Sequence, residues 1–463
     1  MNVPQVTDVQ AFSDLDAKID AAMKSHAIPG VAVGIWADGE ECVKGYGVTN
    51  VDHPTPVDGD TVFRIGSTTK TFTGTAMMRL MDQGMVDLDA PVRRYLPDFA
   101  VADADASAAV TVRQLLNHTP GWLGDDVQDF GRGDDALERY VASMTQLPQL
   151  TPPGAVFAYN NAGLVVAGRI IEVVTGRTYE AAIQHLLLDP LQLRHTRFFS
   201  DDIVGLNLAA SHNVVDGNAV VDTGFWAFPR SCNPTGGLIS TARDQLRYAR
   251  FHLGDGAGLL PRQALVDMRS NPGAGGTLLV EVIGMGVTWM LRPSAEGATI
   301  VQHGGTWSGQ HSGFFMVPER NFAMTVLTNS QGGAELTNEL FADDWALRLF
   351  AGISNLPATP EHLGAADLKP YEGRYIAEQI GVSGSHEKVI LDFRAGDGQL
   401  DGTMSSEDST QETERVGLAF YRPDYGLNLG ADSKPIGSRA NFVRGSDGAI
   451  MWFRSHGRLY RRQ

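Results

Sequence analysis

The spacing of apolar and polar positions divides the chain into a mixed region of helices and strands and a second region of strands alone. Between residues 30 and 52, two short apolar runs flank Asp38-Gly39, a dipeptide that predicts a tight hairpin. Three stretches carry apolar side chains at helical spacing, namely residues 67–83, 161–175 and 240–251. Two strands and one further helix are predicted at residues 313–317, 322–327 and 334–350.

The pattern changes after residue 352. Residues 353–367 are rich in Pro, Ala and Gly, which is typical of a linker. Beyond them, clusters of Gly, Asp and Ser separate five short apolar segments: KVILDF, LAFYRP, YGLNLG, RANFVR and AIMWFR. Such segments are typical of a small antiparallel barrel or sandwich. We therefore expect a first domain over residues 1–352, a linker, and a second domain over residues 368–463.

Composition narrows the classes of partner. The 463 residues include 37 Lys and Arg against 54 Asp and Glu, a net charge of −17. Because phosphate binding needs clustered basic residues and an anionic bilayer repels an acidic protein, we expect neither a nucleic-acid nor a membrane partner. Two cysteines exclude a disulfide framework, and without a His-Glu-x-x-His run we expect no metal or other cofactor. The first residues show neither a basic nor an apolar signal region, which favours the cytoplasm.

The first candidate for chemistry is Gly66-Ser67-Thr68-Thr69-Lys70. If Ser67 begins a helix, Lys70 lies one turn further on the same face. The hydroxyl of Ser67 would then sit in the positive field of the helix N-terminus, and a desolvated Lys70 amine could accept its proton. Taken alone, the pattern also fits a helix-capping serine followed by a solvated lysine.

Two more patterns carry polar groups beside turn-forming residues. In Tyr159-Asn160-Asn161, a phenol near an ammonium can act as a general base, and the Asn161 amide can orient a carbonyl. In His303-Gly304-Gly305-Thr306, two glycines allow a close approach of main chain to substrate and offer N–H groups to an oxyanion. Taken alone, the first also fits an asparagine helix cap, and the second also fits a glycine-rich turn.

Together the three patterns form a known combination. Ser-x-x-Lys, Tyr-x-Asn and a basic residue followed by Gly, in that order, form the motif set of penicillin-recognising serine hydrolases. The surrounding sequence also resembles the family of class C β-lactamases, D,D-peptidases, D-aminopeptidases and related esterases, over about residues 15 to 350. The similar segments are LLNHTPGW (115–122), YNNAGLVVAGRIIEVVTGRTY (159–179), DPLQLRHTRF (189–198) and NPTGGLISTARD (233–244).

The resemblance implies an α+β fold, in which helices flank a central antiparallel sheet and an inserted all-α subdomain forms a cleft with it. It implies that Ser67 is the acylated nucleophile, Lys70 its proton-handling partner and Tyr159 the general base. Asn161 would bind the substrate amide carbonyl. The main-chain N–H groups of Ser67 and Thr306 would form the oxyanion hole, with Gly304 and Gly305 beside the substrate.

The third motif departs from the β-lactamase form, in which Lys-Thr-Gly is expected. His303 is mostly neutral at pH 7 and recognises a carboxylate less well than lysine does. Relatives similar to D-aminopeptidases and archaeal peptidases carry a histidine here, and some append a lipocalin-like barrel, which residues from about 368 onward resemble. Such a barrel could restrict entry to the cleft or only stabilise the chain.

The sequence therefore predicts a serine hydrolase that acts through an acyl-enzyme on small-molecule or peptide substrates, with amides favoured and a homo-oligomer left open. The alternatives are a carboxylesterase, a β-lactamase or penicillin-binding protein, and a non-catalytic ligand-binding homologue. Because Ser67, Lys70 and Tyr159 are all present, the non-catalytic alternative is disfavoured.

Overall fold

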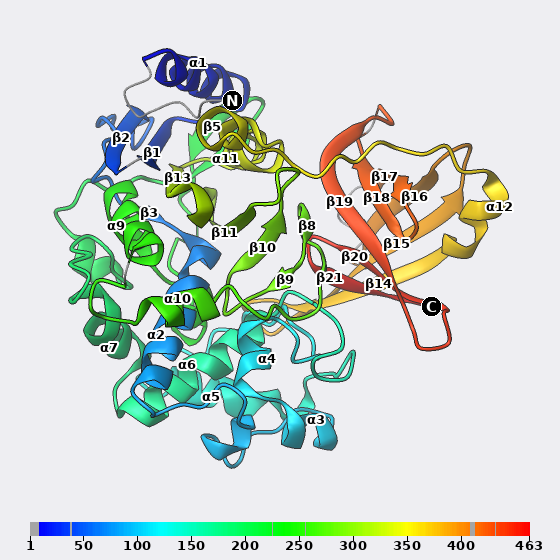
Figure 1. Ribbon diagram of the computed structural model, residues 1–463, viewed down its shortest axis with the longest axis horizontal. Helices are drawn as coiled ribbons and strands as arrows, with labels where there is room; N and C mark the ends of the chain where they lie inside the picture. Colours follow the sequence, from blue (N-terminus) through cyan, green and yellow to red (C-terminus); the bar gives the residue numbers. More distant parts are fainter. Residues whose placement is uncertain (1–8, 38, 225, 255, 408–412, 431) are drawn as a thin grey trace.

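A computed structural model describes residues 9–37, 39–224, 226–254, 256–407, 413–430 and 432–463. The fold is α+β, with a large antiparallel sheet, helices on both of its faces, and a closed barrel at the C-terminal end (Figure 1). In spatial order, the strands of the sheet are β2 (Glu40–Gly47), β1 (Gly30–Ala37), β13 (Phe322–Thr328), β12 (Gln310–Val317), β11 (Thr299–Trp307), β10 (Met290–Pro293) and β9 (Gly284–Met285).

The helices are distributed over the two faces of the sheet and a helical region below it in Figure 1. Their bounds are α1 (Val9–Ser25), α2 (Thr69–Asp82), α3 (Ala104–Ala109), α4 (Val112–Leu116), α5 (Ala136–Ser143), α6 (Asn161–Thr175), α7 (Tyr179–Ile183), α8 (Asn233–Gly236), α9 (Ala242–Leu253), α10 (Arg262–Asp267), α11 (Gly333–Thr337) and α12 (Ala365–Leu368). Three strand pairs lie outside the main sheet: β3 (Phe63–Arg64) with β6 (Ile239–Ser240), β4 (His212–Val215) with β5 (Asn218–Val221), and β7 (Gly276–Thr277) with β8 (Glu281–Val282).

Both faces of the central strands are buried, because successive side chains of a strand point to opposite faces. On β1, Val31, Val33 and Ile35 pack in the same core cluster as helix α1, while Ala32 belongs to the cluster that contains α2 and α6. The sheet is therefore the middle layer of three.

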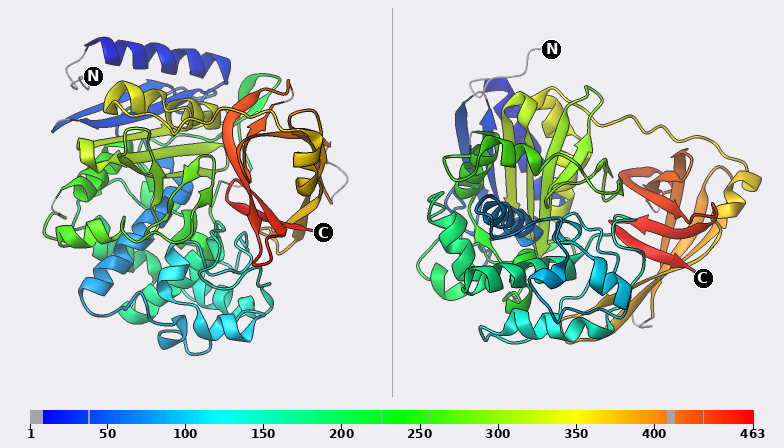
Figure 2. Two further views of the ribbon diagram at one scale, coloured as in Figure 1. Left: turned by 45° about the vertical axis from the view of Figure 1, so that its right-hand side comes forward. Right: turned by 60° about the horizontal axis from the view of Figure 1, so that its bottom comes forward.

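The barrel closes by pairing its first strand with its last. Its strands are β14 (Gly373–Ile380), β15 (His386–Ala395), β16 (Leu400–Ser406), β17 (Glu414–Arg422), β18 (Tyr425–Leu429), β19 (Pro435–Arg444), β20 (Ile450–Ser455) and β21 (Arg458–Arg462). Aromatic side chains such as Phe393, Phe442 and Phe453 fill its interior. One flank of the barrel lies against the helical region and the edge of the sheet (Figure 2).

Most predicted elements are confirmed. Helix α6 has the predicted bounds and ends at Gly176, whose φ of 65° is left-handed, and Thr241 caps α9 by accepting from the N–H of Asp244. The strands β1 and β2 pair as a hairpin, although Asp38 of the predicted turn lies outside the described residues.

Two predictions are wrong in detail. Ser67 lies on a single 3₁₀ turn, Gly66–Thr68, and the α-helix begins only at Thr69. The continuous helix predicted at residues 334–350 is broken, because Asp344 adopts a φ of 58° and its carboxylate accepts from the N–H of Asn355. Within the described part of the chain, no helix is long and apolar enough to cross a membrane.

Candidate active site

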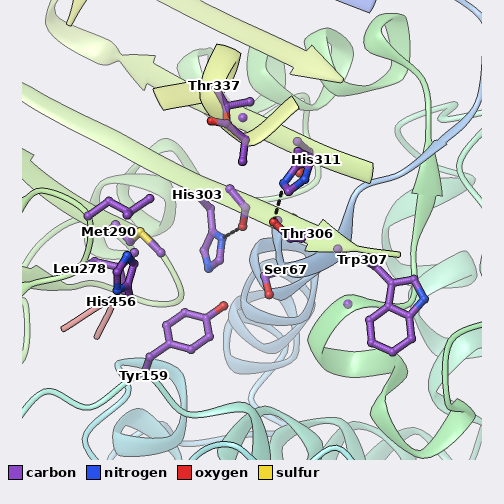
Figure 3. Close-up of a pocket in the computed structure, with 18 of the residues that line it drawn as sticks. Ser67, Tyr159, Leu278, Met290, His303, Thr306, Trp307, His311, Thr337 and His456 are labelled. Carbon is purple, nitrogen blue, oxygen red and sulfur yellow. Dashed lines mark hydrogen bonds between the residues drawn. The ribbon is translucent and has the colours of Figure 1, made fainter. Parts of the chain in front are cut away.

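A cavity of about 650 Å³ lies where the sheet, the helical region and the barrel meet. Ser67, Tyr159 and His303 converge at its centre, and Thr306 and Trp307 lie further along the same strand as His303 (Figure 3). The structure therefore brings all three sequence motifs to one place.

A close main-chain contact fixes the position of Ser67 in the cavity. Gly66 adopts a φ of 49°, and a methyl group there would lie 2.6 Å from the nitrogen of Thr306. A methyl group at Gly305 would lie 2.0 Å from the carbonyl oxygen of Ile65 and 2.4 Å from the nitrogen of Ser67. Because neither glycine has a side chain, the 3₁₀ turn and strand β11 can pack main chain to main chain. Residues 303–306, which taken alone also fitted a glycine-rich turn, lie near the end of strand β11.

Lys70 is the partner of Ser67. Its Nζ donates to Ser67 Oγ at 3.0 Å and to the carbonyl of Thr235 at 2.8 Å, and the side chain has no exposed surface. Burial, together with the nearby Arg458 guanidinium, holds the pKa of Lys70 well below its usual value near 10.5. The amine can therefore exist without its proton under conditions in which an exposed lysine is charged.

Tyr159 faces Ser67 from the opposite side, with its hydroxyl directed towards the serine (Figure 3). Lys70 Nζ lies 4.9 Å from the centre of the phenol ring, and the ring of His118 stacks on it at 4.6 Å. Burial raises the pKa of Tyr159 to about 12, although the nearby Ser67 hydroxyl and the charge of Arg458 act in the opposite direction. The phenol therefore keeps its proton at neutral pH.

His303 is neutral at this position. Burial, with the Lys70 amine nearby, lowers the pKa of His303 to about 3. Its Nδ1 lies 2.7 Å from the carbonyl of Gly304, so that Nδ1 carries the proton and donates it there. Among the described residues, Nε2 has no hydrogen-bond partner, and it is left as an acceptor.

Asn161 lies at the start of α6, next to the cap residue Asn160. Its Nδ2 donates to Asp125 Oδ1 at 2.9 Å, and Arg458 of the barrel donates to both oxygens of the same carboxylate, at 2.7 and 3.1 Å. The Asn161 amide, which is predicted to bind the substrate, is therefore part of a hydrogen-bonded chain that runs through Asp125 to Arg458 of the barrel.

The rest of the cavity is largely apolar. Its lining includes Leu278, Val280, Met290 and Phe341, together with Phe228 and Trp307, whose rings pack against each other. Thr306 Oγ1 lies 2.9 Å from Nδ1 of His311, whose pKa is lowered to about 4 by burial. The described residues contain no group of three His, Cys, Asp or Glu side chains placed to hold a metal ion.

Sequence reasoning missed three residues of this site. Asp125 and Arg458 belong to no motif, and only the folded chain brings them together. His118 is part of the quoted segment LLNHTPGW, which contains none of the three motifs. Its Nδ1 accepts from the N–H of Asn160 at 2.7 Å, so it contacts the Tyr159 segment through both its ring face and its ring nitrogen.

Burial of Lys70 gives a direct prediction for its titration. In a protein labelled with ¹⁵N in the lysine side chains, we expect one Nζ resonance to titrate well below the others, because desolvation disfavours the ammonium form. The Lys70→Met variant assigns this resonance by its loss. A Lys70 resonance that titrates together with the exposed lysines would contradict the prediction.

The two glycines of the third motif form a matched pair for stability. We expect Gly305→Ala to lower the free energy of unfolding by roughly 1–3 kcal/mol, because its methyl group overlaps main-chain atoms that cannot move aside. In Gly304→Ala the methyl group meets only the carbonyl oxygen of Ser312, at 3.0 Å, so a smaller loss is expected. Denaturant unfolding measures the free energy of unfolding of both variants. Equal losses of stability would show that the close main-chain contact at Gly305 does not determine the effect.

Comparisons with known proteins agree with this architecture. The chain is 33% identical to penicillin-binding protein 4 of Amycolatopsis lactamdurans, over 78% of this chain and 96% of that protein. It is 32% identical to esterase EstB of Burkholderia gladioli, over 40% of this chain and 51% of the esterase. The crystal structure of SurE matches 98% of this chain and 99% of its own, with 26% identity and a TM-score of 0.74, and SurE has also been solved with D-Leu. The family model for Beta-lactamase matches residues 15–347, and the chain belongs to this family of serine hydrolases.

Proposed function

We propose that the protein hydrolyses amide or peptide bonds through an acyl-enzyme formed on Ser67. The observation that carries the proposal is the position of Ser67 Oγ between the buried Lys70 amine and the Tyr159 hydroxyl. A serine hydroxyl is a weak nucleophile until a base accepts its proton, and both neighbours can take part in that transfer.

The protonation states favour Lys70 as the first acceptor. The family resemblance implies this role for Tyr159, but burial raises the pKa of the phenol and lowers the pKa of the lysine. In its neutral form, Lys70 donates one N–H to the Thr235 carbonyl and directs its lone pair at the O–H of Ser67. As Ser67 Oγ bonds to the substrate carbonyl carbon, its proton moves to Lys70.

Collapse of the tetrahedral intermediate breaks the bond to the leaving amine, which must gain a proton. Tyr159 donates its phenolic proton to the amine nitrogen and regains one from Lys70, so that both groups return to their resting states. A water molecule then attacks the Ser67 ester. Its proton passes through the same pair to Ser67 Oγ, and the carboxylic acid is released.

The negative charge on the intermediate needs donors at fixed positions. The N–H groups of Ser67 and Thr306 are our candidates, because the main-chain contact at Gly66 and Gly305 sets their separation. Preorganised donors of this kind contribute about a hundredfold or more to the rate of acyl transfer.

The cavity favours substrates with an apolar, uncharged side chain. Among its described lining residues, Asp125, Arg292 and Arg458 are charged; Asp125 pairs with Arg458, and Arg292 donates to the carbonyls of Phe341 and Ala342. No lysine stands at His303 to recognise the carboxylate of a β-lactam. Asp125 occupies one N–H of the Asn161 side chain, and the other can donate to a substrate carbonyl. The D-Leu in a SurE structure makes an apolar D-residue the first substrate to try.

Covalent labelling tests the nucleophile. We expect intact-mass spectrometry to show one fluorophosphonate adduct on the wild-type protein and none on Ser67→Ala, because the buried Lys70 amine activates Ser67. A stable penicilloyl adduct or rapid loss of penicillin would instead move the function towards a penicillin-binding protein or β-lactamase. A wild-type protein that no fluorophosphonate labels would refute the serine hydrolase.

The leaving group separates a peptidase from a carboxylesterase, the alternative that the similarity to esterase EstB supports. We expect measurable cleavage of apolar D- and L-aminoacyl anilides as well as short-chain nitrophenyl esters, because Tyr159 can protonate an amine leaving group. Initial rates with Ser67→Ala as the blank give the comparison. Fast ester cleavage with every anilide left intact would establish the esterase instead.

A further inference from the structure

The turn between β20 and β21 of the barrel touches the segment that carries Tyr159. The carbonyl of Gly457 accepts from the N–H of Tyr159 at 2.8 Å. Gly457 has a φ of 76°, and a methyl group there would lie 3.0 Å from Cβ of Tyr159 and 2.5 Å from Cδ1 of Leu278. Gly457 of the barrel is therefore in close contact with the main chain and Cβ of Tyr159.

The next residue, Arg458 at the start of β21, extends this contact into the cavity. The guanidinium of Arg458 lies 4.8 Å from the centre of the Tyr159 ring, on which it places a positive charge. Its two hydrogen bonds to Asp125 are bidentate, the geometry that fixes a guanidinium most firmly. Asp125 in turn holds the amide of Asn161.

A second contact fixes Asp125 itself. The N–H of Ile380, at the end of β14, donates to the carbonyl of Asp125 at 2.7 Å, and the N–H of Val127 donates back to Ile380 at 3.1 Å. Asp129 makes a similar bond to Val382. The barrel thus holds Asp125 through both its main chain and its side chain.

We propose that the barrel completes the catalytic centre: Gly457 positions the main chain of Tyr159, and Arg458, balanced by Asp125, sets the charge around Tyr159 and Lys70. This inference rests on the proposed acyl-enzyme function. It assigns the barrel a role beyond those of a lid or a stabilising domain, and it makes Arg458 a positioning residue that acts through Lys70 and Tyr159.

The two charges act on Lys70 in opposite directions. The Arg458 cation lowers the pKa of Lys70, and the Asp125 carboxylate raises it. Three other titratable groups face Lys70 from the surrounding elements: Tyr159, His118 and His303. Cys232, whose thiol pKa is raised to about 12 by burial, lies close as well. All four are neutral near pH 7, so Arg458 and Asp125 are the charged neighbours that can be altered selectively.

The pH dependence of fluorophosphonate labelling tests the electrostatic part and requires no natural substrate. If neutral Lys70 activates Ser67, the labelling rate rises with pH around the pKa of Lys70. We expect Arg458→Gln to move this midpoint upward by about one pH unit, which lowers the rate about tenfold below the midpoint. We expect Asp125→Asn to move it downward. Arg461→Gln, which removes an exposed arginine from the same strand, is the control and should leave the midpoint in place.

Three outcomes overturn this part. One is an equal loss of rate at every pH in Arg458→Gln, which indicates only a structural role. Another is a shift in the same direction for Arg458→Gln and Asp125→Asn. The third concerns Arg458→Lys, which retains a cation and serves as a second variant if Arg458→Gln does not fold. Its midpoint should lie near that of the wild type, and a midpoint shifted as in Arg458→Gln counts against the proposal.

A pair of glycines tests the positional part. Gly457→Ala should lower the labelling rate at least about tenfold at every pH without moving the midpoint, because its methyl group displaces Tyr159 and leaves both charges in place. Gly448→Ala is the matched control: this turn residue has a φ of 81°, and its methyl group would meet nothing within 4 Å. Equal rates in the two variants overturn the positional role. An unlabelled wild-type protein instead overturns the proposed function, on which the inference rests.

Discussion

The burial of the Lys70 amine beside Ser67 is the constraint on which the rest of the site depends. Lys70 can be buried only because its remaining N–H groups have partners and because the elements around it close completely. The carbonyl of Thr235 comes from α8, the phenol comes from the segment just before α6, and the neutral His303 comes from the central sheet. Each of these elements packs in the hydrophobic core of the protein, which extends well beyond the site.

The same burial explains why histidine fits where the β-lactamase form of the motif has lysine. A second ammonium in this dry region would repel Lys70 and pay its own desolvation cost. A neutral imidazole avoids both, and it leaves an acceptor nitrogen facing the cavity. The polarity around Ser67 is therefore set largely by neutral donors and acceptors, with the Asp125 and Arg458 charge pair at the barrel side.

Much of the fold follows from local signals in the sequence. Periodicity and capping residues suffice for α6 and α9, and the barrel strands stand out by their length and their separating turns. The motif residues could also be predicted, because Ser67, Lys70, Tyr159 and His303 belong to the three-motif set of penicillin-recognising serine hydrolases. What the sequence could not supply is the pairing of Asp125 with Arg458, because residues 333 positions apart meet only through tertiary structure. The break at Asp344 was missed for a similar reason, since its partner Asn355 lies beyond the predicted helix.

The contact between Gly457 and Tyr159 also imposes an order on the assembly of the protein. Ser67 is synthesised long before the turn that carries Arg458, and domains generally fold as units, the N-terminal one first, during synthesis. A nascent chain can therefore build the sheet and the helical region while the hydrogen bond to Tyr159 still lacks its acceptor. These contacts can form only after the last barrel strands have emerged from the ribosome. A chain interrupted before them would carry Ser67 without Gly457 and Arg458 beside Tyr159.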